Sequence, residues 1–117
     1  WSHSGSLVLC ALSDSPVGVD VEWVRPRAAT LPRYALTPEE DDAFQHQGGD
    51  WSAFYGLWTN KEAWCKYTGQ GLRRHWGASP PKTGLFFPTY AGSGWRACVC
   101  GEESPPDKIV WMEDKPP

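Results

Sequence analysis

The segment from Val17 to Trp23 alternates between two kinds of residue. The valines at 17, 19 and 21 and Trp23 point to one side, whereas Gly18, Asp20 and Glu22 point to the other. This period of two predicts a β-strand with an apolar face and an acidic face. Two adjacent acids on one face repel each other unless a cation or a basic group lies between them. The strand therefore limits the fold to one that supplies such a group or leaves the face in water.

The acid pair has two interpretations. Carboxylate oxygens are ligands that magnesium prefers, and magnesium takes one or two of them while water and substrate phosphates fill its other positions. The alternative is an ordinary strand whose acidic face lies in solvent. The pair taken alone leaves both open.

The middle of the chain predicts two helices. Thr37 before Pro38, with Glu40 three residues after the threonine, is a capping-box helix start, and the glycines at 48 and 49 end that helix. The acids from 39 to 42 then lie near the positive end of the helix dipole, which explains them without a binding role. Asp50 is the expected cap of a second helix, from Trp51 to about Tyr67.

The second helix carries charged residues among apolar ones. Trp58, Glu62 and Lys66 follow one another at intervals of four, so a carboxylate and an ammonium group project from one stripe above an aromatic ring. A surface Glu–Lys pair would stabilise the helix by at most a few tenths of a kcal/mol. That interpretation does not account for the neighbouring tryptophan and cysteine, because charges on a mostly buried helix require a partner or a function.

The N-terminal segment predicts a buried strand preceded by a polar turn. Residues 6–12 are apolar at nearly every position, which is typical of a strand covered on both faces, and the turn at 13–16 predicts a hairpin into the strand at 17–23. The residues Ser2-His3-Ser4-Gly5 offer hydroxyls, an imidazole and backbone amides that could hold a phosphate. A plain turn is the alternative.

The C-terminal part predicts a polar loop and short strands. The loop covers 73–84, the strands cover 85–88, 96–101 and 108–111, and the tail 112–117 is expected to fray. Strands, then helices, then further strands give an α+β fold. A length of 117 residues predicts one domain, 1–117.

Composition excludes several classes of protein. The net charge is −3 with scattered basic residues, which argues against a nucleic-acid surface, and the longest aliphatic run, residues 7–12, is far below the roughly 20 residues of a membrane span. Eight tryptophans predict an aromatic core.

The four cysteines are expected to be buried free thiols in a reducing cytoplasm, without disulfides or zinc: Cys10, Cys65, Cys98 and Cys100. Because the only methionine is Met112, we expect the chain to be part of a longer polypeptide.

The motifs together resemble one family. The order SHSG, apolar strand, VGVDVE, WTNKEAWCK and YTGQGL is similar to the 4′-phosphopantetheinyl transferases of the larger type, which activate surfactin-like peptide synthetases. The resemblance runs from Ser2 to Leu72 and fits poorly from Arg73 to Gly94. It implies antiparallel strands packed on helices, forming the second of two similar halves related by a pseudo-twofold axis.

The resemblance also implies an activity. Such enzymes transfer the phosphopantetheine arm of coenzyme A to a serine of an acyl or peptidyl carrier protein and release adenosine 3′,5′-bisphosphate. By resemblance, Asp20 and Glu62 are magnesium ligands, and Glu22 is a third ligand or acts through water. Glu62, or a water that it holds, would take the proton from the attacking serine.

The resemblance assigns further roles around the nucleotide. Lys66 would bind the pyrophosphate and stabilise charge as the bond breaks, while Ser2 and His3 would contact the 3′-phosphate of coenzyme A. Lys61 matches the motif but receives no catalytic part. These residue types suit phosphoryl transfer, which needs mainly positioning and charge neutralisation.

Three functions remain open at this point. The first is a cytoplasmic magnesium-dependent transferase, working as a homodimer or with an N-terminal half. The second is a truncated domain that binds coenzyme A and magnesium without turnover. The third is an aromatic-rich interaction domain that binds neither.

Overall fold

A three-stranded antiparallel sheet carries the acidic strand. The computed structural model describes residues 1–70, 78–104, 109–110 and 112. The sheet has the order β3 (Val17–Trp23), β5 (Trp95–Gly101) and β4 (Thr89–Gly92), so β3 lies at its edge. The register places Asp20 opposite Cys98 and Glu22 opposite Arg96. The alternation of β3 and the strand at 96–101 were therefore predicted correctly.

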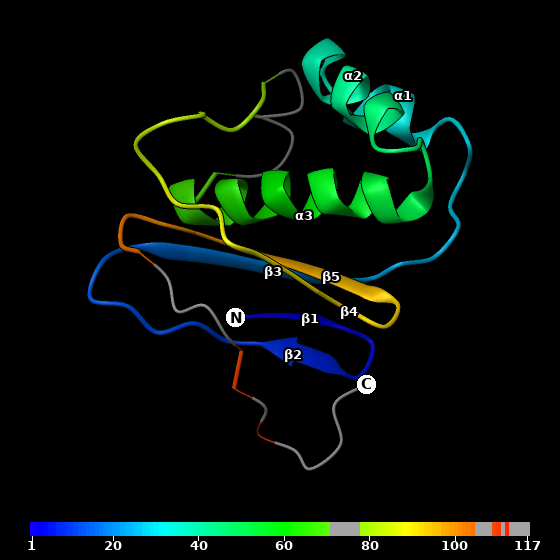
Figure 1. The fold of residues 1–117 in the computed structure, drawn as a ribbon. Helices are drawn as coiled ribbons and strands as arrows, with labels where there is room; N and C mark the ends of the chain where they lie inside the picture. The colour runs from blue at the N-terminus through cyan, green and yellow to red at the C-terminus, as the bar shows by residue number, and fades with distance from the viewer. Residues whose placement is uncertain (71–77, 105–108, 111, 113–117) are drawn as a thin grey trace.

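Helix α3 (Trp51–Thr68) lies across one face of this sheet, as Figure 1 shows. The Asp50 side chain accepts a hydrogen bond from the Ala53 amide, and Gly69 ends the helix in the left-handed conformation with φ 73°. Small side chains fill the interface between the helix and the sheet: Ala63, Cys98 and Cys100 are fully buried there. Because these groups are small, the helix lies close to the strands.

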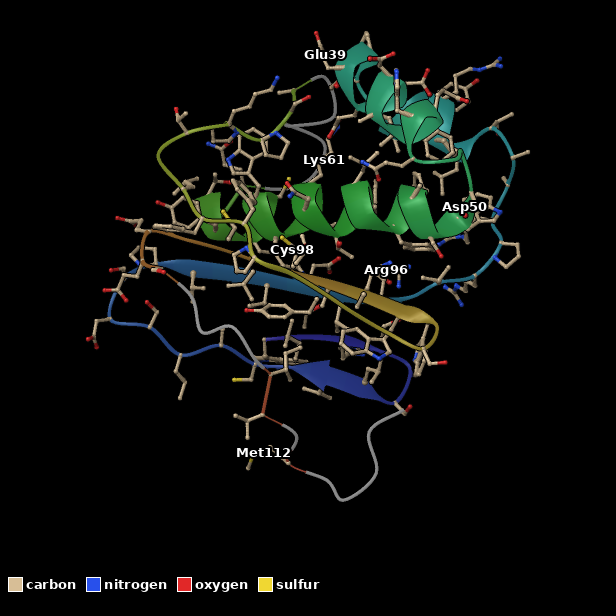
Figure 2. The ribbon with its side chains drawn as sticks, in the orientation of Figure 1. Glu39, Asp50, Lys61, Arg96, Cys98 and Met112 are labelled. Atoms are coloured by element: carbon tan, nitrogen blue, oxygen red, sulfur yellow. The ribbon has the colours of Figure 1, made fainter. Side chains whose placement is uncertain are left out.

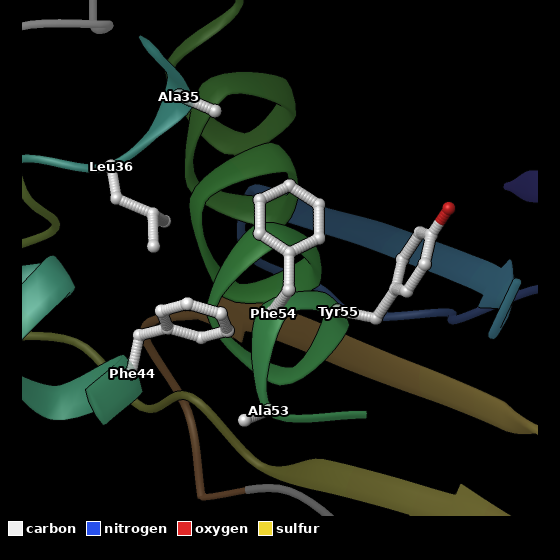
Figure 3. Close-up of a cluster of buried hydrophobic side chains, with 6 residues drawn as sticks. All are labelled: Ala35, Leu36, Phe44, Ala53, Phe54 and Tyr55. Carbon is white, nitrogen blue, oxygen red and sulfur yellow. The ribbon is translucent and has the colours of Figure 1, made fainter. Parts of the chain in front are cut away.

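Two shorter helices, α1 (Leu31–Ala35) and α2 (Pro38–His46), pack on the opposite side of α3. The predicted capping box is present at α2, where Thr37 and Glu40 exchange hydrogen bonds. Figure 3 shows the apolar cluster that joins these helices to the N-terminal half of α3. The cluster consists of Ala35, Leu36, Phe44, Ala53, Phe54 and Tyr55.

A buried ion pair also links α3 to the two short helices. Lys61 is 0% exposed, and its Nζ donates to Glu40 Oε1 at 3.0 Å and to the Ala35 carbonyl at 2.9 Å. Figure 2 shows that the Lys61 side chain points from α3 toward α1 and α2. Lys61 thus anchors the fold on the side of α3 that faces away from the sheet, which explains a charged residue on a buried helix.

The N-terminal segment differs from the prediction. Strands β1 (Ser2–Ser4) and β2 (Leu7–Leu9) pair with each other and form a ribbon on the sheet face opposite α3. The predicted strand at 6–12 is present only over Leu7–Leu9. Its predicted hairpin into β3 is wrong, since β2 pairs with β1 and β3 pairs with β5. Leu7 is buried, but Val8 is 69% exposed and Leu12 is 96% exposed. One face of the two-stranded ribbon packs against the sheet, and its other face is exposed. An apolar run in the sequence does not distinguish this arrangement from a strand that is covered on both faces.

The C-terminal strands also begin at other residues than predicted. The predicted strand at 85–88 is replaced by a single bridge between Phe86 and Gly101, and β4 begins after Pro88. Proline has no N–H to donate to a ladder, which favours a strand that starts beyond it. Of the predicted strand at 108–111, only residues 109 and 110 lie within the described residues, and they form no strand. The predicted fraying of 112–117 falls mostly outside the described residues, as does 73–77 of the predicted loop.

The aromatic side chains of the chain are only partly buried. Phe44, Phe54, Tyr55 and Trp95 are buried, whereas Trp1 is 77% exposed, so the aromatic core is smaller than the tryptophan count predicts. Within the described ranges, no helix has the length and apolarity needed to cross a bilayer.

Gly18 allows the close approach of α3 to β3. A Cβ at this position would overlap the Ala63 carbonyl oxygen and the Tyr67 amide nitrogen. We predict that Gly18→Ala lowers the free energy of unfolding by about 1–3 kcal/mol, because a methyl group forced into a packed interface displaces backbone. Gly56→Ala is the matched control: open space surrounds Gly56 within α3, so alanine should stabilise the helix by about 0.5–1 kcal/mol. Urea unfolding measures both, and equal stability of the two variants would contradict the packing argument.

Candidate active site

Asp20 is the buried centre of the candidate site. It lies on the face of β3 that meets α3 and is 2% exposed. Its Oδ1 accepts hydrogen bonds from Lys66 Nζ at 3.1 Å and from Ser2 Oγ at 3.3 Å. Its Oδ2 is buried and has no hydrogen-bond partner among the residues that the structure describes. A buried carboxylate oxygen without a partner is costly, so this atom is a natural position for a ligand.

Lys66 closes a triangle with Asp20 and Ser2. It lies in the last turns of α3, and its Nζ also donates to Ser2 Oγ at 3.2 Å. The Lys66 side chain is 41% exposed, so its charge is accessible to solvent while it pairs with Asp20. The sequence predicted that Lys66 and Asp20 lie in one site, and the structure brings them together.

Glu22 and Glu62 lie near the same ammonium group. Glu22 follows Asp20 on the same face of β3, and Glu62 precedes Lys66 by one helical turn. Burial raises the pKa of both glutamates, while the Lys66 charge lowers it, and the negative charge of Glu22 raises the pKa of Glu62. The two half-buried acids are thus electrostatically coupled to each other and to Lys66.

The pKa of Asp20 departs furthest from its ordinary value among the three acids. Burial raises the pKa of Asp20 from 3.8 to about 7, Lys66 opposes this effect, and the nearby charges of Glu22 and Glu62 add to it. Three carboxylates therefore lie near Lys66, and the charges of Arg25 and Arg27 also act on Glu22. Repulsion between close carboxylates is relieved when a cation binds to them.

The donor set fits magnesium, although no complete cage is preformed. In the described part of the chain, no three His, Cys, Asp or Glu side chains form a group that could hold a metal ion as they stand. Magnesium needs only one or two protein carboxylates, however, and the free Oδ2 of Asp20 supplies such a ligand beside two further acids. We therefore retain Asp20, Glu22 and Glu62 as the residues that would hold it.

Ser2 and His3 differ in their exposure to solvent. Ser2 is buried, and its hydroxyl accepts from the Val21 amide at 3.2 Å in addition to its contacts with Asp20 and Lys66. His3 is exposed and stacks on the Trp1 ring with centroids 5.7 Å apart. A contact of the Ser2 hydroxyl with a phosphate would require some of its present partners to be released, whereas His3 is accessible.

Sequence reasoning missed the use of the serines inside the fold. Ser2 and Ser4 both reach β3, where the Ser4 hydroxyl accepts from the Trp23 amide at 3.1 Å. A signal was present in the sequence, since Ser2 and Ser4 have the same spacing as Asp20 and Glu22. The position of β1 beside β3, where the two hydroxyls accept from β3 amides, explains this spacing, and the sequence did not predict it.

The cysteines carry free thiols, as predicted, and three of the four are buried. Cys10 is exposed, contrary to expectation, because it lies beyond the end of β2 and leaves the ribbon. Burial raises the pKa of Cys98 to about 12 and that of Cys65 to about 11. These two thiols are therefore protonated at neutral pH, which disfavours a role as nucleophile or metal ligand.

The chain belongs to the 4′-phosphopantetheinyl transferase superfamily, since residues 16–107 match the family model of that description. It is 34% identical over 73 residues to a 4′-phosphopantetheinyl transferase of Bacillus subtilis, a match that covers 61% of this chain and 33% of the relative. It is 38% identical to the transferase psf-1 of Bacillus pumilus over 73 residues, covering 61% and 31%. A putative transferase of Haemophilus influenzae is 36% identical over 77 residues, covering 61% and 33%. The matched region thus spans about a third of these relatives.

We predict that Asp20 makes stability fall as the pH rises. Its pKa of about 7 in the folded chain exceeds the ordinary value of 3.8, so the folded state binds this proton more tightly than the unfolded state. The contribution of Asp20 to the free energy of unfolding should therefore decrease between about pH 4 and pH 7, by no more than about 1.4 kcal/mol per pH unit. Asp20→Asn should flatten this fall in urea unfolding with EDTA present. Parallel pH profiles for the two proteins would contradict the prediction.

Proposed function

We propose that this chain carries the metal and pyrophosphate site of a 4′-phosphopantetheinyl transferase. The reaction would transfer 4′-phosphopantetheine from coenzyme A to a serine of an acyl or peptidyl carrier protein and release adenosine 3′,5′-bisphosphate. The observation that carries the proposal is the group of three acids around Lys66 with one buried, unpaired oxygen of Asp20. Family membership supports the type of reaction.

Each residue of the site has a proposed task. Asp20 and Glu62 would hold Mg²⁺, with Glu22 as a third ligand or one that acts through water. When bound, Mg²⁺ would neutralise charge on the pyrophosphate of coenzyme A. Glu62, or a water that it holds, would accept the proton of the attacking serine, and its raised pKa makes it a stronger base than an ordinary glutamate.

The remaining tasks concern the nucleotide. Lys66 would exchange Asp20 for the pyrophosphate of coenzyme A and would donate to it as charge develops on the leaving group. His3 would contact the 3′-phosphate of coenzyme A through its exposed ring, and Ser2 would assist from the neighbouring position. A cytoplasmic location and a role in activating carrier proteins of secondary metabolism belong to the same proposal.

The coverage of the relatives supports a second candidate function. Because the match spans about a third of each relative, the second candidate is that the chain binds coenzyme A and Mg²⁺ as a module but does not catalyse transfer. We propose that turnover requires a second unit, either a second copy of this chain or an N-terminal half. A carrier protein supplied with coenzyme A and Mg²⁺ separates the candidates: release of adenosine bisphosphate indicates the transferase, and binding without release indicates the module.

We predict that the acids are needed for ligand binding. In the unaltered chain, coenzyme A with Mg²⁺ at 100 times the dissociation constant should add about 2.7 kcal/mol to the free energy of unfolding. Asp20→Ala or Glu62→Ala should abolish this increment and leave the chain folded. Asp14→Ala, which alters an exposed acid, should retain it. If the unaltered chain gains no stability from the ligands, an interaction domain that binds neither is favoured.

We predict that Lys66 acts through its charge. Lys66→Met keeps the apolar stem, and the chain should remain folded because Asp20 can take up a proton when its partner is lost. In whichever assembly of the chain shows transfer activity, the rate should fall by about 10²- to 10³-fold. The reason is that the variant lacks the donor that stabilises negative charge on the leaving group. Lys82→Met, at an exposed position, should not alter the rate. An unchanged rate in Lys66→Met would mean that Lys66 is only a surface partner of the acids.

A further inference from the structure

A groove lies between the N-terminal half of α3 and the strands β4 and β5. Its volume is about 560 Å³. Its floor contains Thr89 and Ala91 of β4 and Arg96 of β5. Its opposite wall is α3, and the helix residues that line it include Ser52, Gly56, Leu57 and Asn60. The groove shares no lining residue with the candidate active site, which uses β1, β3 and the C-terminal half of α3.

The groove exists because α3 is not equally close to the sheet along its length. A Cβ atom at Gly18 would overlap the Ala63 carbonyl oxygen, so the C-terminal half of the helix is in direct contact with β3. Apart from its own stretch of helix, a Cβ atom at Gly56 would meet no atom of the described residues within 4 Å. The N-terminal half of α3 therefore leaves space that a ligand can enter.

Arg96 carries the positive charge of this groove. Its side chain is half-buried, and Figure 2 shows it in the space between α3 and β5. Its Nη1 donates to the Trp95 carbonyl at 2.8 Å. Glu22 lies opposite Arg96 in the sheet, but the two form no ion pair, and no other carboxylate of the described residues forms one with this guanidinium. A guanidinium has five N–H donors, so most of them remain available to an anion.

The charges and the apolar groups of the lining indicate the class of ligand. A carboxylate accepts two parallel hydrogen bonds from one guanidinium. Asp50 also lines the groove, and its negative charge opposes a dianion such as phosphate more strongly than a singly charged carboxylate. Part of the lining is apolar and can contact the body of a ligand: Ala53, Gly56, Leu57, Ala91 and Ala97.

We propose that the groove binds a small carboxylate with an apolar body. The head group pairs with the Arg96 guanidinium, and the body lies against α3 at Gly56. Ligand sites of this kind combine an apolar lining with a few polar groups that orient the ligand. The proposal goes beyond the proposed function and does not depend on it, because this contact needs neither a metal ion nor coenzyme A.

The experiment titrates residues 1–117 with hexanoate and follows the backbone amides by NMR, with EDTA present and coenzyme A absent. Saturable shifts are expected at amides of the groove, including those of Gly56 and Arg96. Arg96→Gln should weaken hexanoate binding by about 10- to 100-fold, because a charge-assisted pair of hydrogen bonds is lost. Arg96→Lys should restore binding only in part, since an ammonium group lacks the paired donors. Arg33→Gln, at an exposed position in α1, should bind hexanoate as the unaltered chain does.

A second variant tests the groove without changing its charge. Gly56→Leu places a side chain in the open space beside α3 and should abolish hexanoate binding. The chain should remain folded, since leucine favours a helix more than glycine does, and urea unfolding checks this. Hexanamide, which has the same body and no charge, should bind the unaltered chain at least about 10-fold more weakly than hexanoate.

Each of three results would overturn the proposal. The first is the absence of saturable shifts when hexanoate is added to the unaltered chain. The second is unchanged hexanoate affinity in Arg96→Gln or in folded Gly56→Leu. The third is that hexanamide binds as tightly as hexanoate, or inorganic phosphate binds more tightly, which would assign the groove to another class of ligand. These results leave the proposed function unaffected, because its tests use Mg²⁺ and coenzyme A.

Discussion

The close packing of α3 on β3 is the constraint on which the site depends. Gly18 leaves room for the backbone of α3 at Ala63 and Tyr67, so the helix lies directly over the acidic face of the strand. At this separation the Lys66 ammonium reaches the buried Asp20 carboxylate at 3.1 Å. A larger residue at position 18 would move the helix and the acid apart. The glycine in the GVD sequence is therefore a packing requirement of the site, although it contributes no side chain to the chemistry.

The three acids of the candidate site are buried or half-buried beside positive charges. Burial raises the pKa of Asp20, Glu22 and Glu62, and the Lys66 charge lowers the pKa of all three. The charges of Arg25 and Arg27 also lower the pKa of Glu22. Lys66 is the counterion of Asp20. In the proposed reaction Lys66 would exchange this partner for a phosphate, so that one lysine would have two successive partners. On the far side of α3, the Lys61–Glu40 pair fixes the helix and contributes no charge to the site.

The sequence predicted the parts of the structure that local chemistry determines. The alternation of Val17–Trp23, the capping box at Thr37 and the Asp50 cap each depend on residues within a few positions, and the structure confirms them. Strand pairing depends on distant segments, and the predicted hairpin from 6–12 into β3 was wrong. The apolar run at 6–12 does not show that only one face of its strand is covered. For the same reason the role of Ser2 and Ser4 beside β3 was not predicted. The proximity of Asp20 and Lys66 was predicted because the family resemblance supplied the long-range contact.

The most direct test of this account is a crystal structure of the chain with Mn²⁺ and coenzyme A, in which the ion is located by its anomalous scattering. The account predicts an anomalous peak bonded to the Asp20 carboxylate, in contact with Glu62, and Lys66 moved from Asp20 to a phosphate oxygen. A peak at any other position, or an intact Lys66–Asp20 ion pair in crystals that contain bound coenzyme A, would contradict the claim that the acidic face of β3 is the metal and pyrophosphate site.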